Sequence, residues 1–352
     1  MKISKYKSVK KLSAAITLRL GSLCVRLNRL TNRVIFLPTL FISVTGRCNS
    51  RCALCGIWKG PDDDLIPAVI EEWVAGFKSL GLKNVVITGG EPLLREDLSD
   101  ILSRLANHGF RLFLCTNGIL LRQRREEILK YFDGVVVSLD SHEPLSYKTI
   151  RGVDAFDEVV SGIASIREGG MRAAIAHTLQ KGNITHLVEF ISFAKGLGVD
   201  SVSIRPLDAY SRGFGSEYGQ LPVRSSLLPS EDEIVAFAKV LARVQKDFSA
   251  DLASGFITPN IKGLWRIRDY LQAQTDDSFP KIQCNAPFSS CVIESNGDIK
   301  PCFFSESFAN IHQKPISELK RLMNSDRARA VRERLKGQSG ICRRCAYPHI
   351  WL

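Results

Sequence analysis

The chain has 352 residues, 45% of them hydrophobic and 24% charged, and its mean hydropathy is close to zero. This composition is globular and excludes a low-complexity or fibrous protein, and the length predicts one large α/β domain with an appendage. The formal net charge of +12 is compatible with anionic partners such as phosphate, nucleic acid or acidic lipid. However, the sequence lacks the aromatic and basic pattern of an RNA-binding surface, which argues against nucleic acid as the direct partner.

Residues 1–39 form a separate basic segment, in which nine lysines and arginines occur and no acidic residue. Apolar residues recur at steps of three or four from Leu12 to Val34, which is the periodicity of an amphipathic helix with one apolar stripe. Arg19 interrupts the apolar region, so the segment has the pattern of neither a signal peptide nor a membrane span. We expect a helix that either packs on the body of the protein or lies on an anionic membrane surface.

From residue 40 the sequence alternates between short apolar runs and longer amphipathic stretches. Strands are predicted at 40–45, 84–88, 110–115, 134–139, 172–179 and 199–205. Helices are predicted between them, at 67–80, 96–107, 121–132, 154–168 and 184–197. This order is typical of βαβ units with a parallel sheet, and right-handed crossovers curl six such units into a barrel or most of one. We assign residues 40–230 to this barrel, with a loop at 207–230.

Polar residues and glycines follow the predicted strands at their carboxyl ends, where parallel barrels carry their chemistry. After the first strand come Cys48, Cys52 and Cys55. The residues that end the later strands are Gly89, Gly90, Glu91 and Pro92 on the second, Cys115, Thr116 and Asn117 on the third, Ser138 and Asp140 on the fourth, and Arg205 on the sixth. We therefore expect all of them at one mouth of the barrel.

The ten cysteines form a tight N-terminal triplet and a looser C-terminal group, which differs from the spread of a disulfide framework. In a protein of this size the pattern favours metal sites in a reducing compartment, so we expect a cytoplasmic protein. Three thiolates within eight residues can hold one iron–sulfur cluster and leave one iron of a four-iron cube open for substrate chemistry. The alternatives are a zinc loop or three unrelated core cysteines. Cys24 and Cys115 are interpreted as small buried apolar residues.

The spacing Cys48-x3-Cys52-x2-Cys55, with an apolar residue before the third cysteine, resembles the motif of the radical S-adenosylmethionine (SAM) superfamily. The resemblance extends over roughly residues 40–206. It implies a partial parallel (β/α)6 TIM-like barrel, a [4Fe-4S] cluster on the three cysteines and SAM on the open iron. It also implies reductive cleavage of SAM to methionine and a 5′-deoxyadenosyl radical, which abstracts hydrogen from the substrate.

The run Gly89-Gly90-Glu91-Pro92 resembles the methionine-binding motif of the same superfamily. By that resemblance, Gly89 and Gly90 allow close approach of the backbone to the methionine amino group. Glu91 is then an acceptor for this amino group or an orienter of the loop. An ordinary acid at a helix start is the structural alternative for Glu91.

Five further residues receive SAM-binding roles from the resemblance. Ser138 and Asp140 are expected to hydrogen-bond the ribose hydroxyls, and Arg151 to pair with the methionine carboxylate. Thr116 and Asn117 are expected to line the pocket. A turn, a turn cap or a surface ion pair is the structural alternative for these residues. No catalytic acid or base is assigned.

Four cysteines near the end of the chain form the second group, namely Cys284, Cys302, Cys342 and Cys345. Four thiolates from a predicted hairpin and a terminal loop can saturate one cluster or one zinc ion. Attached to such a barrel, the spacing Cys-x12-Gly-x4-Cys resembles the SPASM/twitch domains and implies one auxiliary [4Fe-4S] cluster. Cys291 either replaces one of these ligands or packs in the core. We assign residues 231–283 to connecting helices and 284–352 to this domain.

The sequence thus predicts a radical SAM oxidoreductase that oxidises or cross-links a peptide or a small molecule. A reductase, ferredoxin or flavodoxin is the expected electron donor. The alternatives are a nucleic-acid-modifying or lipid-modifying radical SAM enzyme at a membrane surface and a non-catalytic iron–sulfur electron carrier. The carrier would not need the methionine and ribose motifs. A peripheral position at the inner face of the membrane, through residues 1–34, is the alternative to a purely cytoplasmic location.

Overall fold

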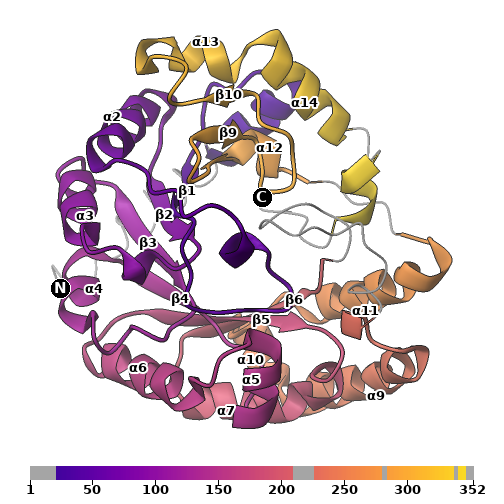
Figure 1. Cartoon of the computed structure of the whole chain (residues 1–352). Helices are drawn as coiled ribbons and strands as arrows, with labels where there is room; N and C mark the ends of the chain where they lie inside the picture. The colour runs from indigo at the N-terminus through magenta and orange to yellow at the C-terminus, as the bar shows by residue number, and fades with distance from the viewer. Residues whose placement is uncertain (1–20, 209–225, 280–283, 337–339, 346–352) are drawn as a thin grey trace, which may run out of the picture.

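The structure is a computed structural model that describes residues 21–208, 226–279, 284–336 and 340–345. Its centre is a sheet in which six strands run parallel in chain order and curve into a partial barrel (Figure 1). These strands are β1 (Thr39–Thr45), β2 (Asn84–Gly89), β3 (Arg111–Thr116), β4 (Gly134–Ser138), β5 (Ala173–Leu179) and β6 (Ser201–Pro206). Each predicted strand is present with its ends within two residues of the prediction. A short seventh strand, β7 (Ile257–Thr258), pairs in parallel with β6.

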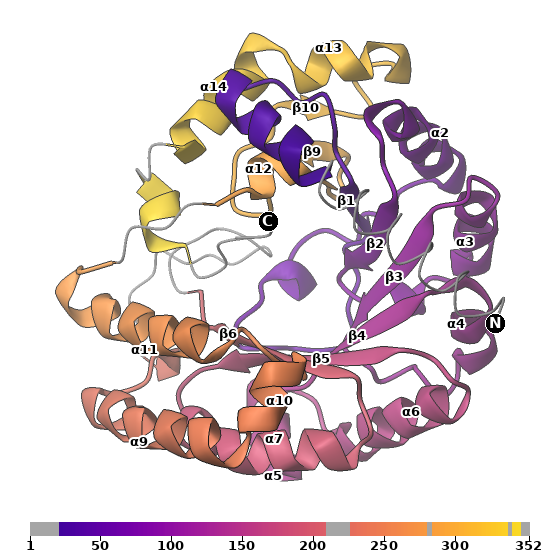
Figure 2. The same cartoon turned by 180° about the vertical axis from the view of Figure 1, so that it is seen from behind.

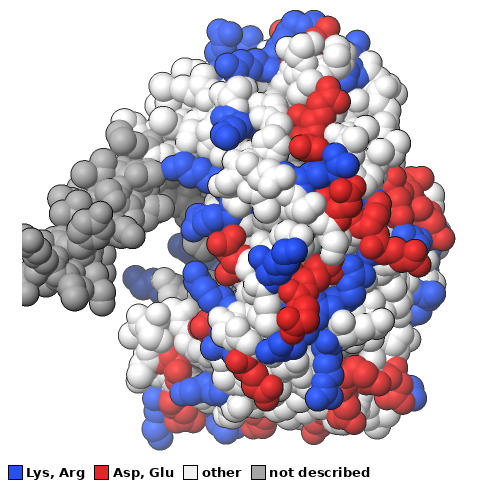
Figure 3. Space-filling view, turned by 90° about the vertical axis from the view of Figure 1, so that its left-hand side faces the viewer, with Lys and Arg blue, Asp and Glu red and all other residues white. Residues whose placement is uncertain are grey.

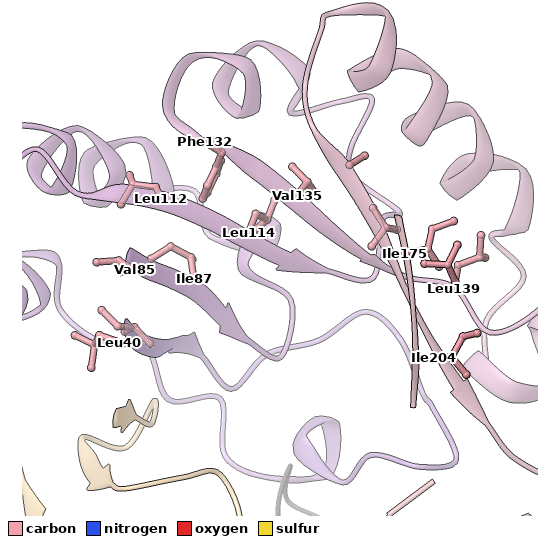
Figure 4. Close-up of a cluster of buried hydrophobic side chains, with 14 of the residues drawn as sticks. Leu40, Val85, Ile87, Leu112, Leu114, Phe132, Val135, Leu139, Ile175 and Ile204 are labelled. Carbon is pink, nitrogen blue, oxygen red and sulfur yellow. The ribbon is translucent and has the colours of Figure 1, made fainter. Parts of the chain in front are cut away.

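Alternate residues of each strand are buried, and this alternation separates the two faces of the sheet. Figure 4 shows the buried side chains, among them Val85, Leu114 and Ile175, on the face that the helices cover. The other face is less buried and carries, on β5, the small and polar residues Ala176 and Thr178. The hydrophobic core therefore lies between the sheet and the helices.

The helices lie around the outside of the sheet (Figure 1). They are α2 (Pro67–Phe77), α3 (Leu98–Ala106), α4 (Arg125–Tyr131), α5 (Pro144–Arg151), α6 (Phe156–Glu168), α7 (Leu187–Gly196), α9 (Glu231–Asp247), α10 (Ser249–Ser254) and α11 (Ile261–Asp276), with short 3-10 turns η1 (Ile57–Lys59) and η3 (Pro92–Leu94) at the mouth. The sequence analysis predicted neither α5 nor α10. Most of the predicted loop at 207–230 lies outside the described residues.

The C-terminal unit continues the barrel sheet. Its strand β8 (Ser290–Ile293) pairs in parallel with β1, and β9 (Asp298–Lys300) and β10 (Ala309–Asn310) follow in antiparallel order. The predicted hairpin turns at Gly297, whose φ of 87° is a left-handed conformation that favours glycine. The helices of this unit are α12 (Ala286–Ser289), α13 (Leu319–Met323) and α14 (Asp326–Lys336), with η7 (Gly340–Arg344) near the end. The two predicted cysteine groups are therefore joined by one sheet.

The N-terminal helix is described over residues 21–31 and ends well before residue 39, where the prediction placed its boundary. It lies across the C-terminal unit (Figure 2), where the side chain of Asn28 donates to the backbone oxygen of Phe288 at 2.9 Å. The first 20 residues of the predicted segment lie outside the described residues. Within the described part of the chain, no helix is long and apolar enough to cross a membrane.

Charged residues of both signs alternate on the face formed by the helices at the left of Figure 1, as Figure 3 shows. Arg104, for example, pairs with Glu71 and Asp100 at 2.9 Å in each case. The positive net charge of the chain therefore does not produce a uniformly basic surface on this face.

Candidate active site

The cysteine loop, residues 48–55, leaves the carboxyl end of β1 at the barrel mouth. Its three thiols are half-buried. Burial raises the pKa of Cys48, and burial together with the neighbouring thiols raises the pKa of Cys55 to about 11. The three sulfurs are thus close enough to interact, and thiols of this kind release their protons when a metal binds.

Two glycines bring the end of β2 against the cysteine loop. The Gly90 N–H donates to the Thr45 oxygen, and the Glu91 N–H donates to the Arg47 oxygen, both at 2.8 Å. A Cβ on Gly90 would lie 2.1 Å from the Arg47 oxygen, and Gly89 has a φ of 130°. The close approach that these glycines permit in the structure is therefore to the chain's own backbone before Cys48.

Glu91 ties the ends of β2 and β3 together. Its carboxylate is fully buried and accepts hydrogen bonds from the Thr116 hydroxyl at 2.9 Å, the Asn117 N–H at 2.7 Å and the Leu93 N–H at 3.0 Å. Burial raises the pKa of Glu91 to about 7, while these hydrogen bonds oppose the rise. The observed role is that of a loop orienter, which also caps the short helix η3.

Asn117 holds the cysteine loop from the end of β3. Its side-chain N–H group donates to Asn49 Oδ1 at 2.7 Å and to Ser50 Oγ at 3.0 Å, and Cys48 Sγ lies 3.9 Å away. The side-chain oxygen of Asn117, Oδ1, accepts a hydrogen bond from the Ile119 N–H at 3.0 Å. Asn117 thus fixes the loop beside the first cysteine.

Arg151 holds the same loop from α5. Its Nη2 pairs with Asp140 Oδ2 at 2.6 Å, and its Nη1 donates to Cys52 Sγ at 3.8 Å. The other oxygen of Asp140 accepts from the Thr178 N–H at 2.6 Å. Both oxygens of Asp140 therefore already accept a hydrogen bond inside the protein.

The backbone at the end of α5 also accepts hydrogen bonds from the cysteine loop. The Arg51 N–H donates to the Arg151 oxygen at 3.0 Å, and the Ala53 N–H donates to the Ile150 oxygen at 3.3 Å. This contact requires Gly152, because a Cβ there would lie 2.3 Å from the Arg51 oxygen and the φ is 68°. This clamp was not predicted from the sequence. Pro144 at the first position of the helix and Gly152 after its last are the signals that would have placed α5.

Ser138 differs from the other predicted SAM-binding residues. It is half-buried at the end of β4, whereas Val137 before it is buried on the opposite face of the sheet. Its hydroxyl makes no hydrogen bond within the described residues. Pro92, the last residue of the glycine motif, is buried at the start of η3. Ser138 is thus the predicted ribose contact that the protein leaves available.

Two buried polar atoms beside the cysteine loop have no hydrogen-bond partner within the described part of the chain, namely Arg151 Nε and the Tyr147 hydroxyl. Both interact electrostatically with Cys52, and burial raises the pKa of Tyr147 to about 12, so its hydroxyl keeps its proton. Buried donors without acceptors are costly, and an anionic group at this loop would satisfy them. The residues present therefore fit a cluster with a carboxylate-bearing ligand.

The described residues contain no group of three His, Cys, Asp or Glu side chains arranged to hold a single metal ion. This is compatible with a four-iron cube, because each thiolate of such a cube ligates a different iron.

The C-terminal cysteines come together beside the β8–β9 hairpin. Burial raises the pKa of Cys302 and brings that of Cys342 to about 12, and the thiols of Cys284, Cys302 and Cys342 interact with one another. The Cys345 N–H approaches the Cys342 oxygen at 3.5 Å in a tight turn. Cys291 is fully buried in the core, and its Sγ lies 3.2 Å from the Lys300 oxygen.

Comparison with protein families assigns both regions. Residues 42–194 match the radical SAM superfamily, and residues 284–346 match SPASM, an iron–sulfur cluster-binding domain. The chain therefore carries a radical SAM domain followed by a SPASM domain. The radical SAM domain implies a SAM-binding [4Fe-4S] cluster, and the SPASM domain implies an auxiliary cluster. The predicted family, fold and cofactor classes are thereby confirmed.

Curated relatives of this radical SAM protein include the probable GTP 3′,8-cyclase of Sulfolobus acidocaldarius, 32% identical over 51% of this chain and 59% of that protein. The GTP 3′,8-cyclase of Aquifex aeolicus is 34% identical over 49% of this chain and 57% of that protein. The match thus spans less than two thirds of these relatives.

Two solved structures share the fold. SuiB of Streptococcus suis bound to S-adenosylmethionine has a TM-score of 0.64 at 17% identity and covers 99% of this chain and 84% of its own. The protein anSMEcpe with bound AdoMet has a TM-score of 0.58 at 17% identity and covers 84% of this chain and 82% of its own.

Proposed function

We propose that the protein binds its catalytic cluster on Cys48, Cys52 and Cys55 and abstracts a hydrogen atom from a peptide substrate at the barrel mouth. The observation that carries the site is the clamped cysteine loop, which the ends of β2, β3 and α5 all hold. When bound and reduced, the cluster and SAM together supply a carbon-centred radical that can take a hydrogen atom. The chain's own residues hold, orient and shield these groups.

The clamp around the cysteine loop preorganises the site. Asn117 fixes the loop beside Cys48, and Arg151 places a buried cation against Cys52. A cation and N–H donors beside a cluster compensate its negative charge and that of a bound carboxylate. Ser138 supplies a free hydroxyl for a ribose, two residues before the Asp140 carboxylate that holds Arg151.

Small side chains on β5 and β6 face the barrel interior and leave their part of it open to a ligand in this proposal. On β5, Ala174, Ala176 and Thr178 alternate with fully or nearly fully buried residues, and Ser203 occupies the corresponding face of β6. Arg205 extends this face to the mouth and is exposed, so it provides a positive charge for an anionic part of a ligand.

The SPASM unit supports an oxidative outcome. We propose Cys284, Cys302, Cys342 and Cys345 as the ligands of the auxiliary cluster. Because β8 pairs with β1, these residues hold an electron-transfer group beside the barrel. Removal of a hydrogen atom from a substrate leaves one further electron to transfer if a new double bond or cross-link is to form. The four thiolates would hold a cluster that supplies an acceptor for this electron, and the substrate would release a proton as the new bond forms.

The peptide substrate is the finer part of the proposal. It is supported by the likeness of fold to SuiB and anSMEcpe, which have both been solved with peptides bound. The curated relatives are named for a reaction of GTP instead. The two substrate classes can be separated directly. If the substrate is a peptide, adding GTP to the reconstituted enzyme leaves the yield of 5′-deoxyadenosine unchanged, whereas a marked rise with GTP would contradict the peptide proposal.

The catalytic site itself is tested by anaerobic reconstitution with iron and sulfide, followed by measurement of 5′-deoxyadenosine. We expect product from the wild type and none from Cys52→Ala. Cys115→Ser is the matched control, because it changes a half-buried barrel thiol outside both proposed ligand sets. Equal product from the wild type and Cys52→Ala would refute the assignment.

A further inference from the structure

The helix of residues 21–31 is attached to the protein by polar side chains. Asn28 is fully buried, and its side chain donates to the Phe36 oxygen at 2.6 Å and to the Phe288 oxygen at 2.9 Å. Just beyond the helix, the side chain of Asn32 donates to the Arg329 oxygen and to Glu333, both at 3.0 Å. The face of this helix that packs against the C-terminal unit therefore depends on amide hydrogen bonds.

The opposite face of this helix is apolar and exposed. Leu23, Leu27 and Leu30 are 62%, 45% and 81% exposed, and their spacing of four and three residues puts them on one side of the helix. We call these three side chains the leucine face. A soluble helix normally buries such a stripe, so a face of this kind marks an interaction site.

Basic residues surround the leucine face. Residues 1–61 contain twelve of the chain's 48 lysines and arginines and none of its 36 acidic residues, so the rest of the chain is electrically balanced. Arg26 and Arg33 are exposed on or just after the helix, and Arg327 and Arg329 are exposed on the neighbouring α14. Nine of these twelve basic residues precede residue 40, so most of the net positive charge lies in the N-terminal segment that carries the leucine face.

We propose that the leucine face docks on a bilayer surface that contains anionic lipids. Apolar side chains flanked by lysine and arginine, without nearby acids in the sequence, are the composition of helices that lie in the membrane interface. The apolar periodicity continues in the sequence through Leu12, Ile16 and Leu20, and five lysines precede these residues. A lipid surface satisfies both features at once, because the acyl region takes the leucines and the headgroups take the charge.

The proposal is tested with the full-length protein and sedimented vesicles. One set consists of equal parts phosphatidylcholine and phosphatidylglycerol, and the other of phosphatidylcholine alone. We expect binding to the anionic vesicles and a loss of about tenfold or more in Leu23→Gln/Leu27→Gln/Leu30→Gln, because the apolar transfer is removed. Val235→Gln is the control, because Val235 is 59% exposed on the distant helix α9.

The dependence of vesicle binding on salt separates the electrostatic contribution from the contribution of the leucine face. Raising the ionic strength from ~0.15 M to ~1 M shortens the Debye length from about 8 Å to about 3 Å, so binding of the wild type should weaken. Equal binding to both vesicle sets would contradict the anionic surface. Undiminished binding of the leucine variant would contradict the leucine face. No binding of the wild type to either set would overturn the proposal and leave a protein partner as the occupant. Formation of 5′-deoxyadenosine in the variant verifies its fold independently.

Discussion

The guanidinium of Arg151 donates a hydrogen bond from Nη1 to the Sγ of Cys52 across 3.8 Å. The same side chain is held by Asp140 at 2.6 Å, and the two side chains are 11% and 2% exposed. A buried ion pair is thereby aimed at one of the proposed cluster ligands. Hydrogen bonds and positive charge near cluster sulfurs favour the reduced, more negative state of a cluster.

Replacing Arg151 by Met should lower the reduction potential of the N-terminal cluster. A difference of about 1.4 kcal/mol between its two redox states corresponds to a shift of about 59 mV for one electron. The substitution also leaves Asp140 buried without its cation, which should cost about 3–5 kcal/mol of unfolding free energy. Potentiometric titration followed by electron paramagnetic resonance (EPR) measures the first effect, and denaturant unfolding measures the second.

The double variant Arg151→Met/Asp140→Leu separates these effects. Replacing the whole buried pair with apolar residues should recover most of the stability. It should not recover the potential, because the contact with Cys52 is still absent. A wild-type potential in the double variant would show that Arg151 acts only through the fold.

Gly152→Ala should loosen the cysteine loop. The new Cβ meets the Arg51 oxygen at 2.3 Å, and alanine tolerates the φ of 68° poorly. We expect a loss of about 1–3 kcal/mol of stability and fewer iron atoms per chain after reconstitution. Gly196→Ala is the matched control, because nothing lies within 4 Å of a Cβ there. Full iron content in Gly152→Ala would show that the α5 clamp does not position the loop.

Ser138→Ala should weaken SAM binding without changing stability. The hydroxyl makes no hydrogen bond within the described residues, so its removal leaves no protein group unpaired. Loss of one hydrogen bond to a ribose, about 0.5–1.5 kcal/mol, raises the Kd about 2- to 12-fold. Equilibrium binding of SAM to the reconstituted protein provides the measurement. An unchanged Kd would remove Ser138 from the proposed site.

His177 makes the stability depend on pH in the acid range. Its ring is buried against Phe190, with centroids 3.8 Å apart, and Nδ1 lies 3.3 Å from the Leu139 oxygen. Burial lowers the pKa of His177 to about 4. The neutral ring therefore contributes stability that is complete above the pKa of the unfolded state, about 6.5, and is lost as the pH falls toward 4.

His177→Phe keeps the aromatic packing and removes this titration. Relative to the variant, the wild type should lose at most about 3 kcal/mol of unfolding free energy between pH 6.5 and pH 4. Denaturant unfolding of both proteins across this range gives the difference. Curves that stay parallel would show that His177 does not titrate on unfolding.

The sequence predicted the six strands well because their signal is local. Buried runs such as Val85 to Ile87 are bounded by turn residues, and parallel pairing then brings their carboxyl ends together. The two cysteine groups were predicted as cluster sites from the spacing of their thiols along the sequence. The helix α5 was missed because its eight residues make only about two turns, too few for a helical repeat to stand out in the sequence, although proline and glycine mark its ends.

The partners of the site residues were beyond prediction. Arg151 and Cys52 are 99 positions apart, and only the folded chain shows that Asp140 holds Arg151 against Cys52. Family resemblance led to the expectation that Asp140 and Arg151 touch SAM. The close contact of Gly90 with the Arg47 oxygen likewise has no signal in the sequence. Nor did sequence reveal that β8 would extend the barrel sheet, because pairing between distant strands leaves no local pattern.

The most direct test of the central claim is whether SAM changes the EPR spectrum of the reduced cluster on Cys48, Cys52 and Cys55. The variant Cys342→Ser/Cys345→Ser removes two proposed auxiliary ligands, so the N-terminal cluster can be observed alone. We expect about four irons per chain in this variant, as one cube requires, and a spectrum that shifts when SAM is added. Loss of all iron, or a spectrum that SAM leaves unchanged, would contradict it.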